Sequence, residues 1–567
     1  MERTDRLAWI DALVAALLAG VLAAAWSVRD WSNLAALRLP DSDDMMRLQQ
    51  IRDWLGGQAF ADLTQYRLGA DGVPMHWSRL PDLVPGVIIW SLDGLVGRHM
   101  AEIVAVIAWP AMLLAAAIGL TGRIARAVGG AEIARPAMIV AAFAYPASTL
   151  FLPGRIDHHN LQIVFALLAT LMLVRPGSMM AGLVAGVATS LSVVVGMETT
   201  PLLALIGLVI VIDWVIGGRP ARDRLMGFGI ALCAATLASS IIFRTIAWDY
   251  AACDGFTAIS ARALMVASFV PIGLALAGWD SSARVRLALG ISSALALAAT
   301  LAISTPQCFA PYGNVPPLLR SLWLMRVGEA QPLFAAPLAV AIGYVGLTVA
   351  GIAAGVWQWR RERSRGWLVL LALQLGAFAV AVMQVRGAYD GAVLAAPALA
   401  AVIVAARRAG ALPLAGAWLA SAGMLYPIAA QAIVPATPPK PGASCTAPDL
   451  VAALGALPPG RVMAPIDTGG VAIAATRQRL IAGAYHRDGA GDLAMYAFYR
   501  GTPEGAAHLA RGWRVDYVVA CDGFADVAAP FAEALERGQA PNWLRPVAAV
   551  PSGGRIFATV ARSAAKP

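Results

Sequence analysis

Residues 100–126, MAEIVAVIAWPAMLLAAAIGLTGRIAR, decide the class of fold because they join a long apolar run to a basic end. The run from 100 to 120 is long enough to cross a bilayer as a helix, which takes roughly 20 residues. Arg123 and Arg126 follow it directly, and arginines that flank a span favour the cytoplasmic side. This stretch therefore predicts a transmembrane helix that ends in a cytoplasmic loop.

The rest of the chain repeats this pattern. Of the 567 residues, 59% are hydrophobic and only 14% are charged, and the mean hydropathy is +0.68. A soluble globular protein of this size carries more charge, so we expect a polytopic α-helical membrane protein with about thirteen transmembrane helices. The apolar spans lie at residues 8–26, 100–120, 136–152, 161–175, 178–196, 200–217, 224–243, 262–278, 286–303, 333–357, 366–385, 389–405 and 410–432.

The positive charge describes topology rather than a nucleic-acid site. The formal net charge is +9, but the arginines fall in short loops between apolar spans. With the amino terminus in the cytoplasm, every second loop is basic, so the loops between them face outward. The outward segments are 27–99, 153–160, 197–199, 244–261, 304–332, 386–388 and the tail from 433. We expect no nucleic-acid partner, and we place the protein in a bacterial inner (plasma) membrane.

Two parts of the outward face have a pattern of their own. Residues 83–96 are apolar but contain Pro85 and Asp93, which predicts an interfacial helix rather than a further span. The tail begins at a cluster of helix breakers, Pro435 to Pro441, after which the hydrophobic runs shorten. We therefore expect a transmembrane domain over 1–434 and a small periplasmic α/β domain over 435–567. Its helices are expected at 448–457, 491–499, 503–512 and 526–537, and its strands at 461–465, 479–484, 516–521 and 555–560.

The five cysteines fit the same topology. Cys253 and Cys308 fall in outward loops, Cys445 and Cys521 fall in the tail, and Cys233 falls inside a span. An oxidising compartment would allow two disulfides, although the sequence does not determine which cysteines pair.

Ionisable residues are the strongest functional signal in such a chain, and they gather in the outward loops. Asp43 and Asp44 lie in the first outward loop, and Asp157, His158 and His159 fill the second. Two carboxylates and an imidazole can bind a divalent cation, Mn²⁺ or Mg²⁺, and leave positions open for substrate. Each group also has a purely structural interpretation: a helix cap for the aspartates of the first loop, and a surface turn for the second.

Two further charged residues lie on the outward face. Glu329 precedes the tenth span, and Arg386 lies at the outer end of the eleventh. Taken alone, each fits a charge at the membrane interface with its apolar stem in the bilayer.

The order of these motifs resembles one known family. Residues 154–159, GRIDHH, are similar to the second acidic motif of archaeal oligosaccharyltransferase catalytic subunits, and Asp43-Asp44 with Arg52 resembles the first. Residues 327–332, VGEAQP, resemble the glutamate element of the long flexible loop in that family. Arg386 lies where the family places its phosphate-binding arginine.

The resemblance covers nearly the whole chain and implies a GT-C glycosyltransferase, which uses a polyprenyl-linked sugar donor from the periplasmic or luminal side. It implies that Asp43, with Asp44 as its alternative, binds the metal together with Asp157 and His159. It also implies that Glu329 helps to order the metal site and the acceptor, and that Arg386 holds the donor phosphate.

One element departs from the family. Its tryptophan-rich acceptor motif corresponds here at best to residues 465–469, PIDTG, in which Asp467 is the only acidic residue and no tryptophan is present. We therefore take Asp467 as a weak acceptor-binding candidate. The acceptor can be a protein, a lipid or a polysaccharide.

These observations predict a metal-dependent membrane glycosyltransferase that moves a sugar or oligosaccharide from a polyprenyl-(di)phosphate to an acceptor on the periplasmic side. Its partners would be that donor, that acceptor and membrane lipids. The alternatives are a transporter or flippase of lipid-linked sugars and a non-catalytic glycan-assembly protein. A transporter usually places ionisable residues near the bilayer midplane, whereas these spans are almost free of charge.

Overall fold

The computed structural model describes residues 3–278, 281–310, 312–434, 444–524 and 527–560. The chain divides into two compact units, which are described separately. The first unit comprises Met1–Leu34, Trp77–Gly313 and Val327–Ala436, and the second comprises Ala35–His76, Asn314–Arg326 and Thr437–Pro567. The second unit thus joins the tail to two segments from outward loops. The cluster of helix breakers at Pro435 to Pro441 lies outside the described residues.

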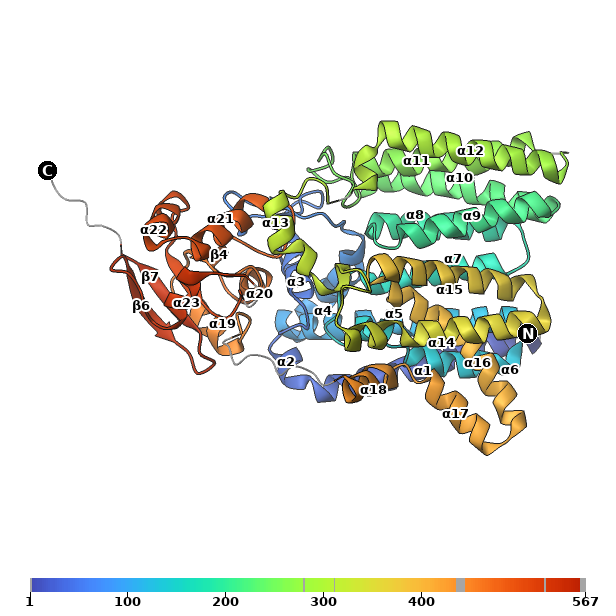
Figure 1. Cartoon of the computed structure of the whole chain (residues 1–567), viewed down its shortest axis with the longest axis horizontal. Helices are drawn as coiled ribbons and strands as arrows, with labels where there is room; N and C mark the ends of the chain where they lie inside the picture. The colour runs from blue at the N-terminus through green and yellow to red at the C-terminus, as the bar shows by residue number, and fades with distance from the viewer. Residues whose placement is uncertain (1–2, 279–280, 311, 435–443, 525–526, 561–567) are drawn as a thin grey trace. The chain divides into compact units, whose positions relative to one another are not determined.

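The first unit consists of helices that run side by side (Figure 1). They are α1 (Arg3–Arg29), α4 (Leu83–Val96), α5 (Arg98–Gly129), α6 (Ala131–Ala142), α7 (His159–Val174), α8 (Met179–Val195), α9 (Thr200–Ile216), α10 (Arg219–Ile242), α11 (Ala258–Ala277), α12 (Ala283–Ser304), α14 (Leu338–Glu362), α15 (Arg365–Met383), α16 (Gly387–Ala409), α17 (Ala411–Ser421) and α18 (Leu425–Ile433). The short 3₁₀ helices η1 (Leu80–Asp82), η2 (Ala147–Phe151), η3 (Pro306–Phe309) and η5 (Gly328–Ala330) lie in the connections. Helix α2 (Trp31–Ala35) lies where the two units meet in the chain.

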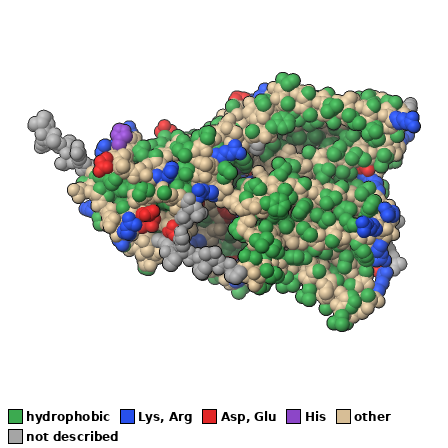
Figure 2. Space-filling view, in the orientation of Figure 1, with side chains coloured by type: hydrophobic (Ala, Val, Ile, Leu, Met, Phe, Trp, Pro, Cys, Tyr) green, Lys and Arg blue, Asp and Glu red, His purple; other side chains and the backbone are tan. Residues whose placement is uncertain are grey.

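This unit has the character of a multi-pass membrane protein. Eight helices among the described residues are long and apolar enough to cross a membrane, or up to nine if the bent pair α17 and α18 is one span. Helix α12 is an extreme case, because none of its described side chains is buried. Figure 2 shows hydrophobic side chains over the visible face of the helices and basic ones at the end where α14 is followed by α15.

All of the predicted spans overlap helices, but two of them are not single straight helices. The span expected at 136–152 consists of α6, an irregular segment with the cis bond Tyr145-Pro146, and η2. The span expected at 410–432 bends by 83° between α17 and α18. Helices α7, α8 and α9 are apolar but shorter than 18 residues. The total of about thirteen spans therefore stays a prediction.

An ion cluster joins three helices of this unit. Asp213, in the last turn of α9, accepts from Arg224 of α10 at 2.9 Å and from Arg365 Nε of α15 at 2.7 Å. Both arginines also donate to the main-chain oxygen of Leu173 at the end of α7, at 3.0 Å in each case. These arginines therefore satisfy helix ends and one carboxylate.

The second unit is built on a small sheet, as expected. Its strand order is β4-β3-β5-β7-β6, in which β4, β3 and β5 are parallel and β7 and β6 are antiparallel to their neighbours. Its elements are α3 (Ser42–Leu55), β1 (Thr64–Gln65), β2 (Val73–Pro74), α13 (Pro317–Leu322), η4 (Leu324–Arg326), α19 (Pro448–Gly455), β3 (Arg461–Met463), α20 (Thr468–Ala475), β4 (Arg479–Leu480), α21 (Gly489–Arg500), α22 (Pro503–Gly512), β5 (Tyr517–Ala520), α23 (Pro530–Glu536), β6 (Leu544–Ala549) and β7 (Arg555–Thr559).

Two elements of the described tail, residues 444–560, were not expected from the sequence. Strand β6 contains Pro546, which breaks the alternating pattern of a strand. The proline is tolerated because β6 lies at the edge of the sheet and has an irregular register between Pro546 and Ala548. Helix α20 contains a glycine pair, Gly469-Gly470, which lowers its intrinsic helix propensity.

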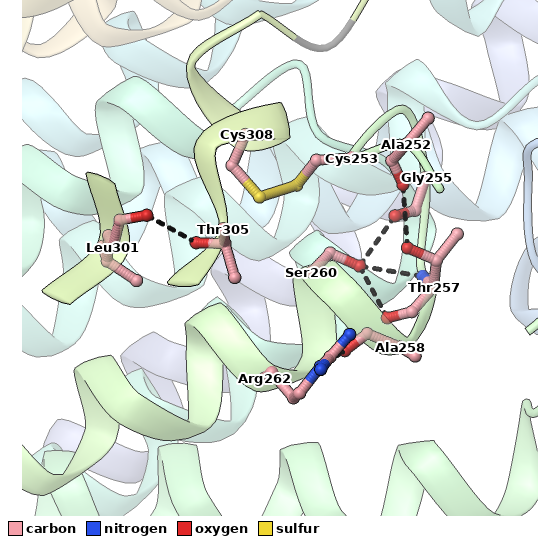
Figure 3. Close-up of a disulfide and its surroundings, with 10 residues drawn as sticks. All are labelled: Ala252, Cys253, Gly255, Thr257, Ala258, Ser260, Arg262, Leu301, Thr305 and Cys308. Carbon is pink, nitrogen blue, oxygen red and sulfur yellow. Dashed lines mark hydrogen bonds between the residues drawn. A yellow bond between two sulfur atoms is a disulfide. The ribbon is translucent and has the colours of Figure 1, made fainter. Parts of the chain in front are cut away.

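The two disulfides are confirmed, and the fold determines their pairing. Cys253 pairs with Cys308 in the first unit (Figure 3), and Cys445 pairs with Cys521 in the second. Cys233, within α10, is the free cysteine of the described chain, as predicted. The first bridge links the loop before α11 to the turn after α12, and the capping box of Thr257 and Ser260 lies beside it (Figure 3).

Candidate functional site

The Asp-His-His stretch is held in a short turn before α7. Gly154 has a φ of +92°, a conformation that favours glycine, and its N–H donates to Val106 O at 2.8 Å. Asn160 in the first turn of α7 is buried and donates to Leu150 O at 3.1 Å and to Arg155 O at 2.9 Å. These bonds close the turn, so the side chains between them have little freedom.

The turn brings three possible ligand groups together. One ligand atom from each of Asp157, His158 and His159 lies within 4.8 Å of the others. Asp157 Oδ2 is 3.5 Å from His159 Nε2, and Asp157 Oδ1 is 2.6 Å from His158 Nδ1. The structure therefore brings Asp157, His158 and His159 together, and the role of Asp157 and His159 as metal ligands stays a prediction.

A fourth member of the cluster, Glu198, was not expected from the sequence. It lies in the loop between α8 and α9, and its carboxylate contacts His158 Nε2 at 3.3 Å. Gln162 Nε2 donates to its other oxygen at 2.9 Å. The side chain of Glu198 is 14% exposed. A carboxylate in a very short outward loop, residues 197–199, was the signal that could have identified it.

Burial and these contacts act in opposite directions on the pKa values of His158 and Glu198. Burial by itself lowers the pKa of His158, but the carboxylates of Asp157 and Glu198 raise it to about 10. Burial likewise raises the pKa of Glu198, and the neighbouring His158 lowers it well below its usual range. His158 thus has a carboxylate at each ring nitrogen, which leaves neither nitrogen free for a metal ion.

Arg386 and Glu329 meet this cluster from the other side. Arg386 lies directly before α16, and its main-chain N–H donates to Glu329 O at 3.1 Å. Its guanidinium is 3.8 Å from Glu329 Oε1 and 3.9 Å from Glu198 Oε1. Glu329 Oε1 is also 3.8 Å from His159 Nε2. The structure therefore brings together Asp157, His159, Glu329 and Arg386, four residues predicted from three separate motifs.

Arg386 is buried, but not all of its hydrogen-bond donors are used. Its side chain is 9% exposed, and its Nε has no hydrogen-bond partner among the described residues. Burial by itself lowers its pKa, but the charges of Glu329 and Glu198 contribute to raising it, so the group stays a cation. A buried guanidinium with an unused donor is suited to bind an anion such as a phosphate.

A pocket opens beside these residues within the first unit. One part of its wall is polar and includes His159, Gln162, Glu198 and Arg386. The other part is apolar and is formed by Leu150, Ile163, Leu202, Ala377 and Val380. A ligand with a charged head and a hydrocarbon tail would match both parts.

The remaining predicted residues belong to the second unit. Asp43 and Asp44 lie in the first turn of α3, but the N-cap is Asp41, whose carboxylate accepts from Asp43 N at 3.0 Å. The capping role considered for Asp43 and Asp44 therefore belongs to Asp41. Asp44 is fully buried, whereas Asp43 is partly exposed.

Asp467 also lies in this unit, directly before α20, and its side chain is exposed. Helix α20 packs against α3. The contact is close, because a Cβ on Gly470 would lie 2.9 Å from Ser42 O. Tyr485 donates to the same oxygen at 3.2 Å. Within the second unit, the Asp467 motif and the Asp43 motif are therefore carried by neighbouring helices.

The donor set of the first unit fits a divalent cation. Asp157 Oδ2 and His159 Nε2 face each other, and Glu329 Oε1 approaches the same imidazole nitrogen. Carboxylate oxygen with a single imidazole suits Mn²⁺ or Mg²⁺ better than a thiolate-preferring metal. A possible metal-binding Asp-His-His group is thus present in the described chain.

Comparison with known proteins identifies the fold. The sequence matches no protein-family model and no curated protein. The archaeal oligosaccharyltransferase AglB from Archaeoglobus fulgidus, in complex with an inhibitory peptide and a dolichol-phosphate, has a TM-score of 0.65 and 16% identity over 92% of this chain and 70% of that chain.

Two further structures of the oligosaccharyltransferase of that organism are also similar. The apo form has a TM-score of 0.69 and 16% identity over 90% of this chain and 69% of that chain. The complex with Zn and sulfate has a TM-score of 0.60 and 15% identity over 97% and 73%. The chain therefore has the fold of the GT-C membrane glycosyltransferases, as its motifs suggested.

Proposed function

We propose that this protein is a membrane glycosyltransferase that transfers a sugar or oligosaccharide from a polyprenyl-(di)phosphate donor to an acceptor. The observation that carries the proposal is the pocket that is lined by His159, buried Arg386 and several apolar side chains, with Asp157 Oδ2 3.5 Å from His159 Nε2. The similar structure of AglB holds a dolichol-phosphate, which is a ligand of the same chemical kind.

The roles of the residues follow from the charge that develops in the reaction. Departure of a phosphate or diphosphate from a sugar places negative charge on oxygen, and a fixed guanidinium stabilises that charge. Arg386 is suited to this role because Glu198 and Glu329 orient it and its Nε is unused. The apolar wall would take the first isoprene units of the donor.

We further propose that transfer depends on a divalent cation held by Asp157 and His159. When bound, the cation would neutralise charge on the leaving (di)phosphate. Asp43, with Asp44 as its alternative, is proposed as a ligand from the sequence resemblance. Glu329 is proposed to order the site, because it contacts both His159 and Arg386.

The acceptor side is proposed to include Asp467. One structure of the Archaeoglobus fulgidus enzyme is tethered to an acceptor peptide containing the NVT sequon. The PIDTG segment of this chain has no tryptophan. The acceptor of this chain can therefore differ, and a protein, a lipid and a polysaccharide are all compatible with one exposed carboxylate.

We propose that the reaction takes place on the periplasmic side of a bacterial inner membrane. Both disulfides lie in segments assigned to the outward side, where oxidising conditions preserve them. Arg123 lies toward the end of α5, and Arg224 and Arg365 lie in the first turns of α10 and α15. These are the helix ends that the basic loops predict to be cytoplasmic.

The direct test compares glycans and glycolipids by mass spectrometry in cells with and without this protein. We expect one glycosylated product to disappear and its polyprenyl-linked donor to accumulate. A flippase would instead change the distribution of the donor across the membrane while purified protein showed no transfer. Absence of transfer by purified protein that binds the accumulated donor would refute the enzymatic proposal.

A further inference from the structure

The carboxylate of Glu198 lies at the junction of two hydrogen-bond chains. One oxygen contacts His158 Nε2 at 3.3 Å, and His158 Nδ1 contacts Asp157 Oδ1 at 2.6 Å. The other oxygen accepts from Gln162 Nε2 at 2.9 Å, and Gln162 Oε1 faces His159 Nδ1 at 3.3 Å. Both candidate metal ligands, Asp157 and His159, are thus connected to one carboxylate through one intermediate side chain each.

The chain through Gln162 determines which nitrogen of His159 carries the proton. An ionised carboxylate can only accept, so Gln162 must turn its NH₂ group toward Glu198. Its oxygen then faces His159 Nδ1, which must be the protonated nitrogen in order to donate to it. The lone pair of a neutral His159 is therefore on Nε2, the nitrogen that faces Asp157 Oδ2 at 3.5 Å.

The chain through His158 fixes the other ligand. His158 is buried, and the carboxylates at both of its nitrogens leave it one orientation. It holds Asp157 by Oδ1, which leaves Oδ2 directed at His159. His158 therefore acts as a link between two carboxylates.

The loop that carries Glu198 is itself held in place. Thr199 Oγ1 and Ser192 Oγ share a hydrogen bond of 2.9 Å across the loop. A Cβ on Gly196 would lie 2.3 Å from Glu198 Oε2 and 2.9 Å from Gln162 Nε2, so the backbone approaches the network closely. The geometry of the network is consequently determined by packing rather than by side-chain freedom.

We propose that Glu198 is a positioning residue that prepares the metal site. It selects the metal-accepting tautomer of His159 through Gln162 and directs Asp157 through His158. This inference rests on the proposed metal dependence, and it assigns a function to a residue outside the motifs shared with the oligosaccharyltransferases. Loss of a residue that orients a metal ligand typically costs about 10–100-fold in metal affinity.

The test measures binding of Mn²⁺ alone to the purified full-length protein in lipid nanodiscs, from the electron paramagnetic resonance signal of free Mn²⁺. We expect Glu198→Ala to weaken binding about 10–100-fold. Gln162→Met should weaken it as well, because the amide link to His159 is lost without a change of charge. Wild-type affinity in Gln162→Met would overturn the tautomer argument, since a general charge effect of Glu198 would survive that substitution.

A rescue experiment separates positioning from a structural role. In the double variant Glu198→Ala with Gln162→Glu, the new carboxylate can accept directly from His159 Nδ1. We expect this variant to recover most of the affinity lost in Glu198→Ala. If Glu198 only supports the packing of its loop, a second substitution at 162 would recover nothing, and that result would overturn the proposal.

Matched controls come from the same unit. Gln374 is buried and donates to Leu394 O at 2.7 Å, so Gln374→Met makes the same chemical change away from the network. Glu102 is buried and paired with Arg98 at 3.2 Å, so Glu102→Ala removes a comparable carboxylate. The folded fraction of both should bind Mn²⁺ as the wild type does. Failure of the wild type itself to bind would refute the proposed metal dependence instead.

Discussion

Two ion clusters of the first unit lie at opposite ends of the same two helices, and they are built in opposite ways. Helix α9 begins two residues after Glu198 and contains Asp213 in its last turn. Helix α15 begins with Arg365 and ends three residues before Arg386. A 17-residue helix spans about 25 Å, so the two clusters are separated by most of a bilayer core.

At the Asp213 end, cations outnumber carboxylates. Arg224 and Arg365 share one aspartate, and each also donates from Nη1 to a helix-end carbonyl. At the Glu198 end, acidic groups outnumber cations: Asp157, Glu198 and Glu329 surround Arg386 and two histidines, beside a pocket. Among the described residues, Arg224 in the first cluster and Arg386 in the second each have an Nε without a hydrogen-bond partner, but Arg386 lines the pocket and Arg224 does not, so we expect the second cluster to bind a cation and an anion. A structural cluster and a candidate catalytic one are thus distinguished by their balance of charge.

The largest expected effect would follow from removing the candidate metal ligands of the cluster at the Glu198 end. Asp157→Ala and His159→Ala should each lower transfer by roughly 1,000-fold or more, because the cation could no longer be held. EDTA should do the same to the wild type. Transfer by purified protein is the measurement, and gel filtration verifies that each variant is folded. Full activity in EDTA, with metal removal verified by elemental analysis, would contradict the metal dependence.

The aspartate pair of the second unit sharpens the same prediction. Asp43→Ala should abolish transfer if Asp43 is the ligand, and Asp44→Ala should then be milder in activity. Because Asp44 is fully buried, Asp44→Ala should lower thermal stability more than Asp43→Ala does. The reverse order of activities would exchange the two roles.

Removing Asp213 from its cluster should lower the stability of the protein and leave metal binding unchanged. Asp213→Ala leaves the buried Arg224 without its carboxylate, and removal of one partner from a buried pair costs about 3–5 kcal/mol. Thermal unfolding in detergent should show this loss, while the folded fraction should bind Mn²⁺ as before. Unchanged stability, or a specific loss of metal binding, would remove the distinction between the two clusters.

A smaller effect is expected from a substitution of Arg386 in the cluster at the Glu198 end. Arg386→Lys keeps the charge but loses the planar fork, and a charge-assisted hydrogen bond contributes about 1.5–3 kcal/mol. We therefore expect affinity for a polyprenyl phosphate to fall about 10–100-fold. Wild-type affinity in this variant, measured by binding to the nanodisc-bound protein, would return Arg386 to the role of an interfacial charge.

The smallest effect concerns the sides of the membrane on which the clusters lie. Labelling of the denatured, unreduced protein with a thiol reagent should modify Cys233 alone, because the other four cysteines are paired. After reduction, all five should react. Labelling of Cys253 without reduction would show that this disulfide is absent. The disulfides would then no longer support an oxidising compartment on the side of the Glu198 cluster.

Much of this molecule could be read from local sequence. The apolar runs and the arginine-rich loops predict the helices of the first unit, and the outward cysteines predict two disulfides. Asp157, His158 and His159 could be singled out because they share one short loop, and the family resemblance then selected Asp157 and His159. Each of these inferences depends on neighbours in the chain.

Other features could not be read in this way. Glu198 belongs to no motif, and although it lies in a very short loop, its contacts with His158 and Gln162 follow only from the packing of α7 and α8. The interruption of the 136–152 span and the edge strand β6 depend on prolines, at positions 146 and 546, whose effect is set by their surroundings. The pairing of Asp213 with Arg365 joins residues 152 positions apart.

The sequence by itself determined that this chain is a multi-pass membrane protein, and it predicted that the ionisable groups gather on one side. Transfer into lipid is a sum over the residues of each segment, so hydropathy and loop charge are readable without knowledge of the fold. Only the tertiary structure decided which charges satisfy one another and which stay available to a ligand. A hydrogen bond depends on distances of about 3 Å between atoms from separate helices, and packing sets those distances.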